Sequence, residues 1–158
     1  MAEERRMSMI LFSGDMDKAM AALVLATGAA SMGYHVTVFC TFWGLNLIKK
    51  SEALAQGGIL ERMMGFMNRG GTDHMPLSRM NMLGLGPRLL KKMMREKKVA
   101  TLRDLLDTAL ELGVEFVACQ MSMDVMGVSK EDLAVPCEVG GVATFLNEAG
   151  KSRINLFI

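Results

Sequence analysis

The chain has 158 residues, the length of one ordinary domain, and its 51% hydrophobic and 22% charged residues exclude a disordered protein. Eighteen lysines and arginines nearly balance seventeen aspartates and glutamates, so the overall charge gives no indication of nucleic-acid binding. The cysteines, Cys40, Cys119 and Cys137, are too few and too scattered for a disulfide framework. With no apolar signal segment and no apolar run of about 18 residues, we expect a single-domain cytoplasmic protein that spans no membrane.

The first part of the sequence predicts a β-α-β unit. Residues 7–13 form a short apolar run, and residues 35–40 are rich in β-branched and aromatic side chains, so each predicts a buried strand. An alanine-rich helix is expected between them, over about 16–32, with Asp15 as its cap and Gly33 as its stop. Because crossover connections are right-handed, the two strands should be parallel.

The rest of the sequence continues this alternation. Helices are expected over about 45–55, from Gly86-Pro87, from Thr101 with Asp104 as its capping-box partner, from Ser129, and before Gly150. Strands are expected over 114–119, within 135–141 and over 153–158. Strands that alternate with helices predict an α/β fold whose open, mostly parallel sheet is covered on both faces.

Residues 60–98 differ in composition from the rest of the chain. The stretch from Arg62 to Lys98 holds eight of the seventeen methionines and nine basic residues against two acidic ones. We expect a basic, Met-rich accessory segment that lies outside the sheet, with a loop over 68–76.

Three interpretations of this segment stay open. In its helix, apolar Leu89 and Met93 face one way and basic Arg88 and Lys92 face the other, as in a surface helix that covers the sheet. The same pattern suits a helix that docks an acidic partner or a membrane surface. Thioethers are also ligands for copper(I), and the candidate donors are His74, Met75, Met80 and Met82.

Two cysteines end predicted strands. Cys40 ends the second strand and Cys119 the third, so both should open at the carboxyl edge of the sheet, where ligands and reactive groups gather. The residues after Cys119 favour a helix start, whose unpaired N–H groups stabilise a solvent-exposed thiolate. Any of the cysteines can instead be a small core residue, and Cys137, which can also face this edge, is closest to that interpretation.

Other kinds of site have little support. The two histidines, His35 and His74, are far apart and no cysteines are paired, so we expect no metal site. No glycine-rich phosphate loop occurs. Asp15 and Asp17 suit a helix start better than an acid–base pair, and no metal or organic cofactor is expected.

Four stretches of the sequence resemble a known family: residues 9–19, 35–45, 117–127 and 138–146. They are similar to the DsrE/DsrF-like sulfur-relay family, and in particular to its longer two-cysteine branch, often labelled peroxiredoxin family protein. That label by itself adds no expectation of peroxidase chemistry. The resemblance implies one domain over 1–158, a three-layer α/β/α sandwich and assembly into oligomers.

The resemblance also implies a function. The family's persulfide-carrying cysteine corresponds to Cys119, and the additional cysteine of this branch corresponds to Cys40, which would hold a second persulfide or resolve the first as a disulfide. Sulfane sulfur would come from a rhodanese-like donor and pass to a TusA-type carrier. The alternative is a non-catalytic thiol redox-sensing or binding module that docks a membrane or protein through residues 60–98.

Overall fold

The computed structural model describes residues 5–51, 58–60, 62–63 and 68–158. One sheet holds five strands in the order β4-β3-β2-β1-β5, and each strand is parallel to its neighbours. The strands are β1 (Arg6–Leu11), β2 (His35–Cys40), β3 (Glu115–Cys119), β4 (Glu138–Gly140) and β5 (Ile154–Phe157). The α/β fold with an open parallel sheet, expected from the sequence, is confirmed.

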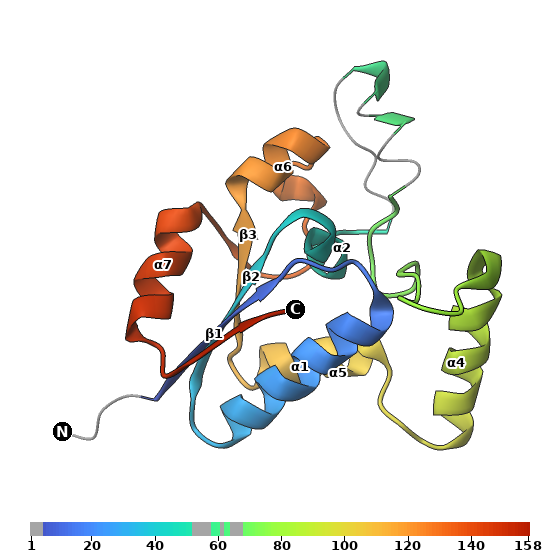
Figure 1. Ribbon diagram of the computed structural model, residues 1–158, viewed down its shortest axis with the longest axis horizontal. Helices are drawn as coiled ribbons and strands as arrows, with labels where there is room; N and C mark the ends of the chain where they lie inside the picture. Colours follow the sequence, from blue (N-terminus) through green and yellow to red (C-terminus); the bar gives the residue numbers. More distant parts are fainter. Residues whose placement is uncertain (1–4, 52–57, 61, 64–67) are drawn as a thin grey trace.

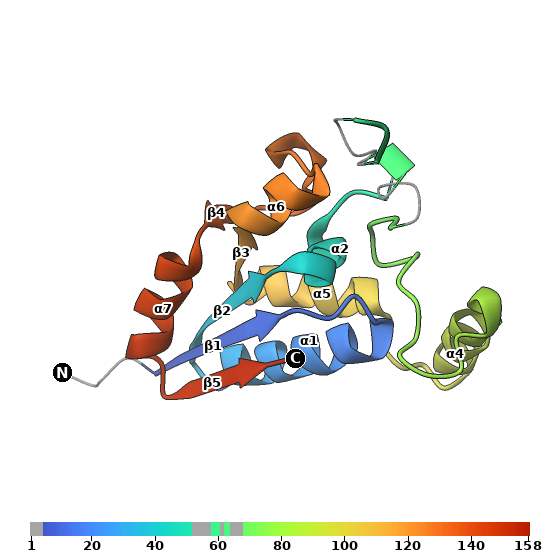
Figure 2. The same ribbon diagram turned by 45° about the horizontal axis from the view of Figure 1, so that its top comes forward.

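Helices lie on both sides of this sheet. They are α1 (Met16–Ser31), α2 (Leu45–Ile48), α4 (Leu85–Glu96), α5 (Leu102–Glu111), α6 (Gln120–Met126) and α7 (Val142–Lys151). Helices α1 and α5 cover one face, while α7 and α6 lie toward the other, and α4 stands at the side of the domain (Figures 1 and 2). Three short 3₁₀ turns connect these elements: η1 (Phe42–Gly44), η2 (Met82–Gly84) and η3 (Lys130–Asp132).

The two faces of the sheet are packed unequally. Alternate strand residues such as Met9, Val38 and Phe116 point toward α1 and α5, where they form the main hydrophobic core. The opposite face carries a small cluster of three buried residues, Phe39, Val117 and Cys119, against which Ile10 and Phe145 pack. The second face therefore buries far fewer apolar residues than the face that packs against α1 and α5.

Helix starts agree only in part with the expectations. The capping box of Thr101 and Asp104 is formed in both directions, as expected. Asp15 occupies the N-cap position of α1, but its side chain makes no capping bond. Instead, its carboxylate accepts a hydrogen bond from the Ser13 hydroxyl at 3.0 Å and pairs with the Lys18 ammonium at 2.8 Å.

Some helices are shorter or begin elsewhere than expected. The helix expected over 45–55 ends at Ile48, because Lys49 takes an extended conformation and forms a bridge with Leu133; residues 52–57 lie outside those described. Only the 3₁₀ turn η3 follows Ser129. Helix α4 begins two residues before Pro87.

The described part of the basic, Met-rich segment contains no strand, and residues 68–76 form a loop, as expected. This loop is tied to α1, because the backbone N–H of Met16 donates to the Pro76 carbonyl at 2.7 Å. Met75 is buried in the main core. Within the described residues, no helix is long and apolar enough to cross a membrane.

Candidate active site at the carboxyl end of β3

Cys119 is the last residue of β3, and the next residue begins α6. Its side chain packs with Phe39 and Val117 on the less covered face of the sheet, where it is 6% exposed. The sequence predicts a solvent-exposed thiol, but the Cys119 side chain is much more buried than this expectation. The neighbouring side chains on the sheet leave only a small part of Cys119 exposed.

Hydrogen bonds surround the sulfur of Cys119. Burial by itself raises the pKa of this thiol, but donors at Ser122, Thr41 and Met121 outweigh burial and bring the pKa below its ordinary value. The donors are the backbone N–H groups of Met121 and Ser122, together with the hydroxyls of Thr41 and Ser122, of which one donates to the sulfur while the other bonds its neighbour. The thiolate, which is the nucleophilic form, is therefore favoured at this position.

Thr41 lies beside Cys119 because β2 pairs with β3, and the chain turns sharply after Thr41. Its hydroxyl oxygen lies 2.8 Å from that of Ser122, which is fully buried. The next residue, Phe42, has a φ of 47°, a conformation that L residues seldom adopt. Gly44 follows, and a Cβ at that position would lie 1.9 Å from the Leu11 carbonyl oxygen. Only glycine allows this turn to pass so close over the end of β1.

Cys40 lies in a different environment from Cys119. In the sheet Cys40 pairs with Ala118, so Cys119 is one residue further along and its side chain points to the opposite face. Cys40 is fully buried in the main core, and burial, followed by the nearby Cys137, raises the pKa of its thiol far above the ordinary range. The two strands end at one edge, as expected, but their thiols do not meet there.

Cys137 comes before the first residue of β4 and packs partly buried against the main core. It therefore lies toward the amino end of this strand, and the possibility that it faces the carboxyl edge is wrong. Burial raises the pKa of its thiol, although Lys130 acts in the opposite direction. Cys137 thus resembles Cys40 more than Cys119.

Two partners of Cys119 were not identified from the sequence. Ser122 follows Cys119 by three residues, the spacing at which a helix-capping side chain meets an N–H group of the first turn. That spacing was a usable signal. Thr41 had no such signal, because it is 81 residues from Ser122 and meets it only through the pairing of β2 with β3.

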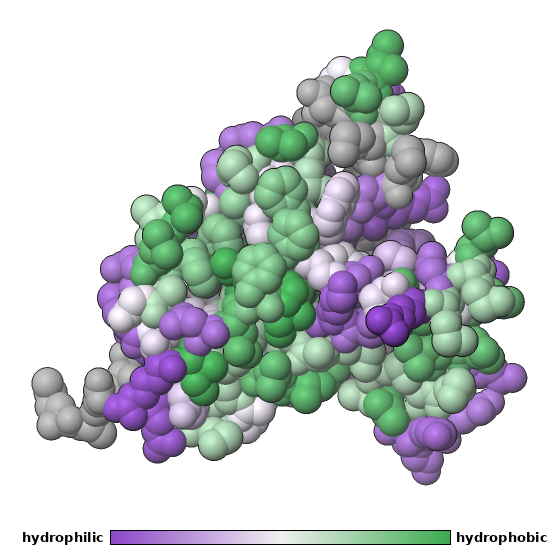
Figure 3. Space-filling model, in the orientation of Figure 1, coloured by the Kyte–Doolittle hydropathy of each residue, from purple (hydrophilic) through white to green (hydrophobic). Residues whose placement is uncertain are grey.

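An apolar surface borders the strand ends. In Figure 3, hydrophobic side chains gather in the middle of the face shown, between α7, α6 and the C-terminus. Phe12 lies between Phe42 and Phe157, with ring centroids 5.6 and 5.8 Å apart, and we call these three residues the aromatic row. Phe157 is 68% exposed. Exposed apolar surface of this kind marks interaction sites.

Among the described residues, no group of three or more His, Cys, Asp or Glu side chains could hold a metal ion. The candidate reactive group at this edge is the Cys119 thiol with its hydroxyl and amide donors. This arrangement can form and hold a thiolate, and can exchange sulfur with another thiol.

Comparison with solved structures supports the fold. The chain resembles the ychN protein of E. coli, whose crystal structure matches with a TM-score of 0.57 over 98% of this chain and 99% of that one. The two sequences are 9% identical, so this likeness concerns the fold alone.

Comparison of sequences identifies closer relatives. The chain is 44% identical to the uncharacterized protein YrkE of Bacillus subtilis over 157 residues, which cover 99% of this chain and 98% of that protein. It is 33% identical to the sulfur carrier protein DsrE2 of Allochromatium vinosum, with 99% of each chain covered. Residues 3–157 match the DsrE/DsrF/DrsH-like family. The protein belongs to the DsrE/DsrF/DrsH-like family.

Proposed function

We propose that this protein carries sulfane sulfur as a persulfide on Cys119 and passes it to the thiol of a partner protein. The observation that carries the proposal is the set of donors from Thr41, Met121 and Ser122 that lowers the pKa of the Cys119 thiol. A relative that is 33% identical bears the name sulfur carrier protein, which supports a sulfur-relay role.

The chemistry needs two exchange steps. In the first, the Cys119 thiolate attacks the outer sulfur of a donor persulfide R–S–SH, which yields Cys119–S–SH and R–S⁻. In the second, the thiolate of an acceptor attacks the outer sulfur of Cys119–S–SH, which forms the acceptor persulfide and restores the Cys119 thiolate. Atoms and charge balance in both steps without an oxidant. Hydrogen bonding from Thr41 and Ser122 stabilises the negative charge on the Cys119 sulfur whenever the thiolate is present.

Cys119 is the best supported of the three cysteines. The pKa of Cys119 lies below its ordinary value, whereas burial raises the pKa of Cys40 and of Cys137. A persulfide on Cys40 would require its side chain to leave the main core, where it is fully buried. The proposal therefore gives Cys119 the carrier role and leaves Cys40 no step that the exchange requires.

The partners belong to the proposal as well. A rhodanese-like donor and a TusA-type acceptor are the partners that family membership suggests. The aromatic row offers an apolar surface to a protein, either one of these partners or a second copy of the chain. All three cysteines are free, which suits a reducing compartment such as the cytoplasm.

Mass spectrometry of the intact protein tests the proposal. Incubation with polysulfide should add about 32 Da for each sulfur atom, and a reductant should remove it. The Cys119→Ser variant should lose this addition, while Cys137→Ser should keep it. Transfer is then tested by adding a TusA-type protein and following the added mass from one chain to the other. Full loading and transfer by Cys119→Ser would refute the proposal.

A second candidate function rests on α4 and the turn before it. Of the residues in α4, only Pro87 and Met94 are buried, and Leu85 and Leu89 are more than half exposed. The helix therefore does not cover the sheet. This differs from the first interpretation of the segment, which expected a surface helix that covers the sheet. Its exposed apolar and basic side chains suit docking to an acidic protein or an anionic membrane. Sedimentation with anionic vesicles, against neutral vesicles as control, tests this function.

A further inference from the structure

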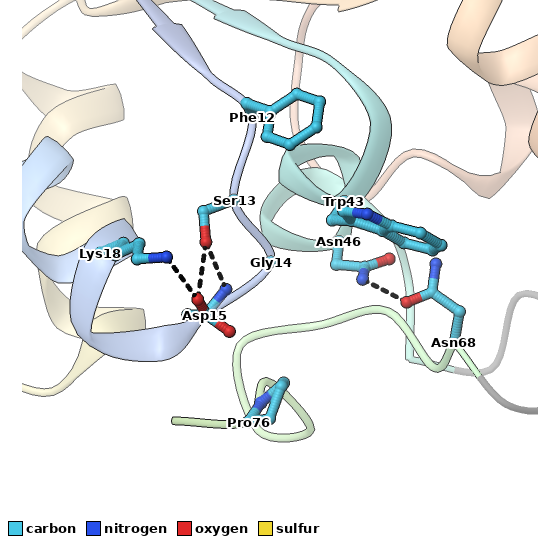
Figure 4. Close-up of a pocket in the computed structure, with 9 residues that line it drawn as sticks. All are labelled: Phe12, Ser13, Gly14, Asp15, Lys18, Trp43, Asn46, Asn68 and Pro76. Carbon is cyan, nitrogen blue, oxygen red and sulfur yellow. Dashed lines mark hydrogen bonds and ion pairs between the residues drawn. The ribbon is translucent and has the colours of Figure 1, made fainter. Parts of the chain in front are cut away.

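A cavity of about 430 Å³ opens at the carboxyl ends of β1 and β2. Its walls come from the loop after β1, which holds Ser13 and Asp15, from Trp43 and Asn46 after β2, and from Asn68 (Figure 4). Cys119 is not among the lining residues, so sulfur exchange leaves the cavity unexplained. Its volume is within the range of small-molecule sites.

The amide side chains of Asn46 and Asn68 have unused hydrogen-bonding capacity. Asn46 is 4% exposed, and its Nδ2 donates to Asn68 Oδ1 at 2.6 Å. The remaining atoms, Asn46 Oδ1 and Asn68 Nδ2, are buried and have no hydrogen-bond partner in the described part of the chain. In Figure 4 both atoms lie on the Trp43 side of the bond that joins the amides. If the oxygen and nitrogen positions are exchanged in both side-chain amides, one hydrogen-bond donor and one acceptor still remain without a partner.

These amides are held in place by the backbone around them. The backbone carbonyl of Asn46 accepts a hydrogen bond from the backbone N–H of Gly71 at 2.8 Å. The backbone carbonyl of Asn68 accepts one from Lys49 Nζ at 3.4 Å. A Cβ at Gly14 would lie 2.9 Å from Trp43 Cβ and 3.4 Å from Asn46 Nδ2, so the loop after β1 packs directly against both residues. The backbone that carries the two amides is therefore fixed before any ligand arrives, and the bond between Asn46 Nδ2 and Asn68 Oδ1 ties the side chains together.

The other walls add an aromatic surface and a carboxylate. Trp43 is 41% exposed and presents a large flat indole ring to the cavity. Asp15 lies on the opposite wall, with the Ser13 hydroxyl and the Lys18 ammonium bound to its carboxylate. A fitting ligand therefore has a flat ring with a neutral donor beside an acceptor, and hydroxyl groups at some distance from that edge.

We propose that this cavity binds an adenine nucleoside, either free or as part of a nucleotide. Adenine presents its exocyclic amino group beside a ring nitrogen, which is the edge that asparagine amides read. Asn46 Oδ1 would accept from the amino group, and Asn68 Nδ2 would donate to the ring nitrogen. Trp43 would stack on the base. The Asp15 carboxylate would accept from ribose hydroxyls, a role that acidic side chains take in other nucleotide sites.

Fluorescence of Trp43 gives a direct test, because it is the single tryptophan of the chain. Adenosine should change this fluorescence saturably, and calorimetry should give the same affinity. Purine riboside, which lacks the exocyclic amino group, leaves the buried Asn46 oxygen unpaired and should bind at least about tenfold more weakly. Comparison of adenosine with AMP distinguishes a nucleoside site from a nucleotide site, since only AMP offers a phosphate to Lys18.

Variants locate the binding. Asn68→Ala and Asn46→Leu should each weaken adenosine binding at least about tenfold. Asn147→Ala, which removes an exposed amide from α7 outside the cavity, should leave it unchanged. Melting curves show whether each variant is folded, and Asn68→Ala is the decisive variant because Asn68 is less buried than Asn46.

Three outcomes would overturn the proposal: no saturable adenosine binding below about 1 mM, equal affinities for adenosine and purine riboside, or unchanged binding by folded Asn68→Ala. Persulfide loading of Cys119 is measured in the same variants and should stay at the wild-type level. Failure of the nucleoside site and failure of the sulfur-carrier function are thus separate results.

Discussion

The hydroxyl oxygens of Thr41 and Ser122 lie 2.8 Å apart, although 81 residues separate them in the sequence. Thr41 follows β2 and Ser122 lies in the first turn of α6, so the parallel pairing of β2 with β3 brings the two together. Because these hydroxyls bond each other, one of them at a time can donate to the sulfur of Cys119, and hydrogen bonding from this pair lowers the pKa of the thiol. This relationship distinguishes Cys119 from the two other cysteines.

Persulfide loading should depend on Cys119. In Cys119→Ser the added mass of about 32 Da should disappear, because the other two thiols have raised pKa values and form little thiolate at neutral pH. Cys137→Ser should load fully, and Cys40→Ser should retain at least part of the loading. Intact-mass spectrometry measures all three. A Cys40→Ser protein that loads nothing while remaining folded would contradict the single-carrier proposal.

The reactivity of Cys119 should shift with pH when a donor is removed. Thr41→Val keeps the side-chain shape but removes a hydroxyl that lowers the pKa, so the Cys119 pKa should rise. The thiolate then forms only at higher pH, and the midpoint of the iodoacetamide rate against pH should move upward. Thr27→Val, whose hydroxyl bonds the Leu23 carbonyl within α1, is the control and should leave the midpoint in place. An unshifted midpoint in Thr41→Val would show that Thr41 is not a partner of the thiolate.

Stability at alkaline pH should depend on Cys40. The pKa of Cys40 is raised in the folded protein, so the unfolded chain releases the thiol proton at a lower pH than the folded protein does. The contribution of the protonated thiol to the free energy of unfolding is therefore full below the ordinary thiol pKa. It is lost as the pH rises toward and through the pKa of the folded state. The loss cannot exceed about 1.4 kcal/mol per pH unit for one group. Urea unfolding from pH 8 to 10 should therefore show a smaller decline for Cys40→Ala than for the wild type. Parallel declines would mean that Cys40 does not titrate on unfolding.

Removing charge from α4 and from the two lysines that follow it should affect docking more than folding. The variant replaces Lys92, Arg95, Lys97 and Lys98 with glutamine, and keeps Lys91 because its Nζ donates to the Asp73 carbonyl at 2.8 Å. Exposed charges contribute little to stability, so the free energy of unfolding should change by less than about 1 kcal/mol. Sedimentation with anionic vesicles should fall, and salt should weaken the wild-type binding in the same way. Wild-type sedimentation that is insensitive to salt would remove the basis for docking by charge.

The aromatic row should support self-association. Light scattering at micromolar concentration should give a mass above that of one chain, because the exposed ring of Phe157 gains from burial against a second copy. Phe157→Ser should lower the mass, whereas Val24→Ser, an exposed apolar residue of α1, should not. A wild-type mass of one chain would leave the aromatic row to a different partner.

Local pattern alone determined much of this protein. Short runs of apolar, β-branched and aromatic residues predicted the strands that end in Cys40 and Cys119, and the capping box of Thr101 predicted the start of α5. These features depend on neighbours within a few residues, which the sequence displays directly. The resemblance to the DsrE/DsrF-like family included these strand ends, and the family model over residues 3–157 confirmed it.

Tertiary structure decided what the strand ends can do. Which face Cys40 and Cys119 occupy depends on strand register, since a shift of one residue reverses the side of the sheet. The donation of Thr41 to the Cys119 thiol and the bond between Asn46 and Asn68 join residues from different elements, and no local pattern marks such pairs. The sequence therefore predicted where the candidate cysteine lies, while the packing of distant segments determined which thiol has a lowered pKa.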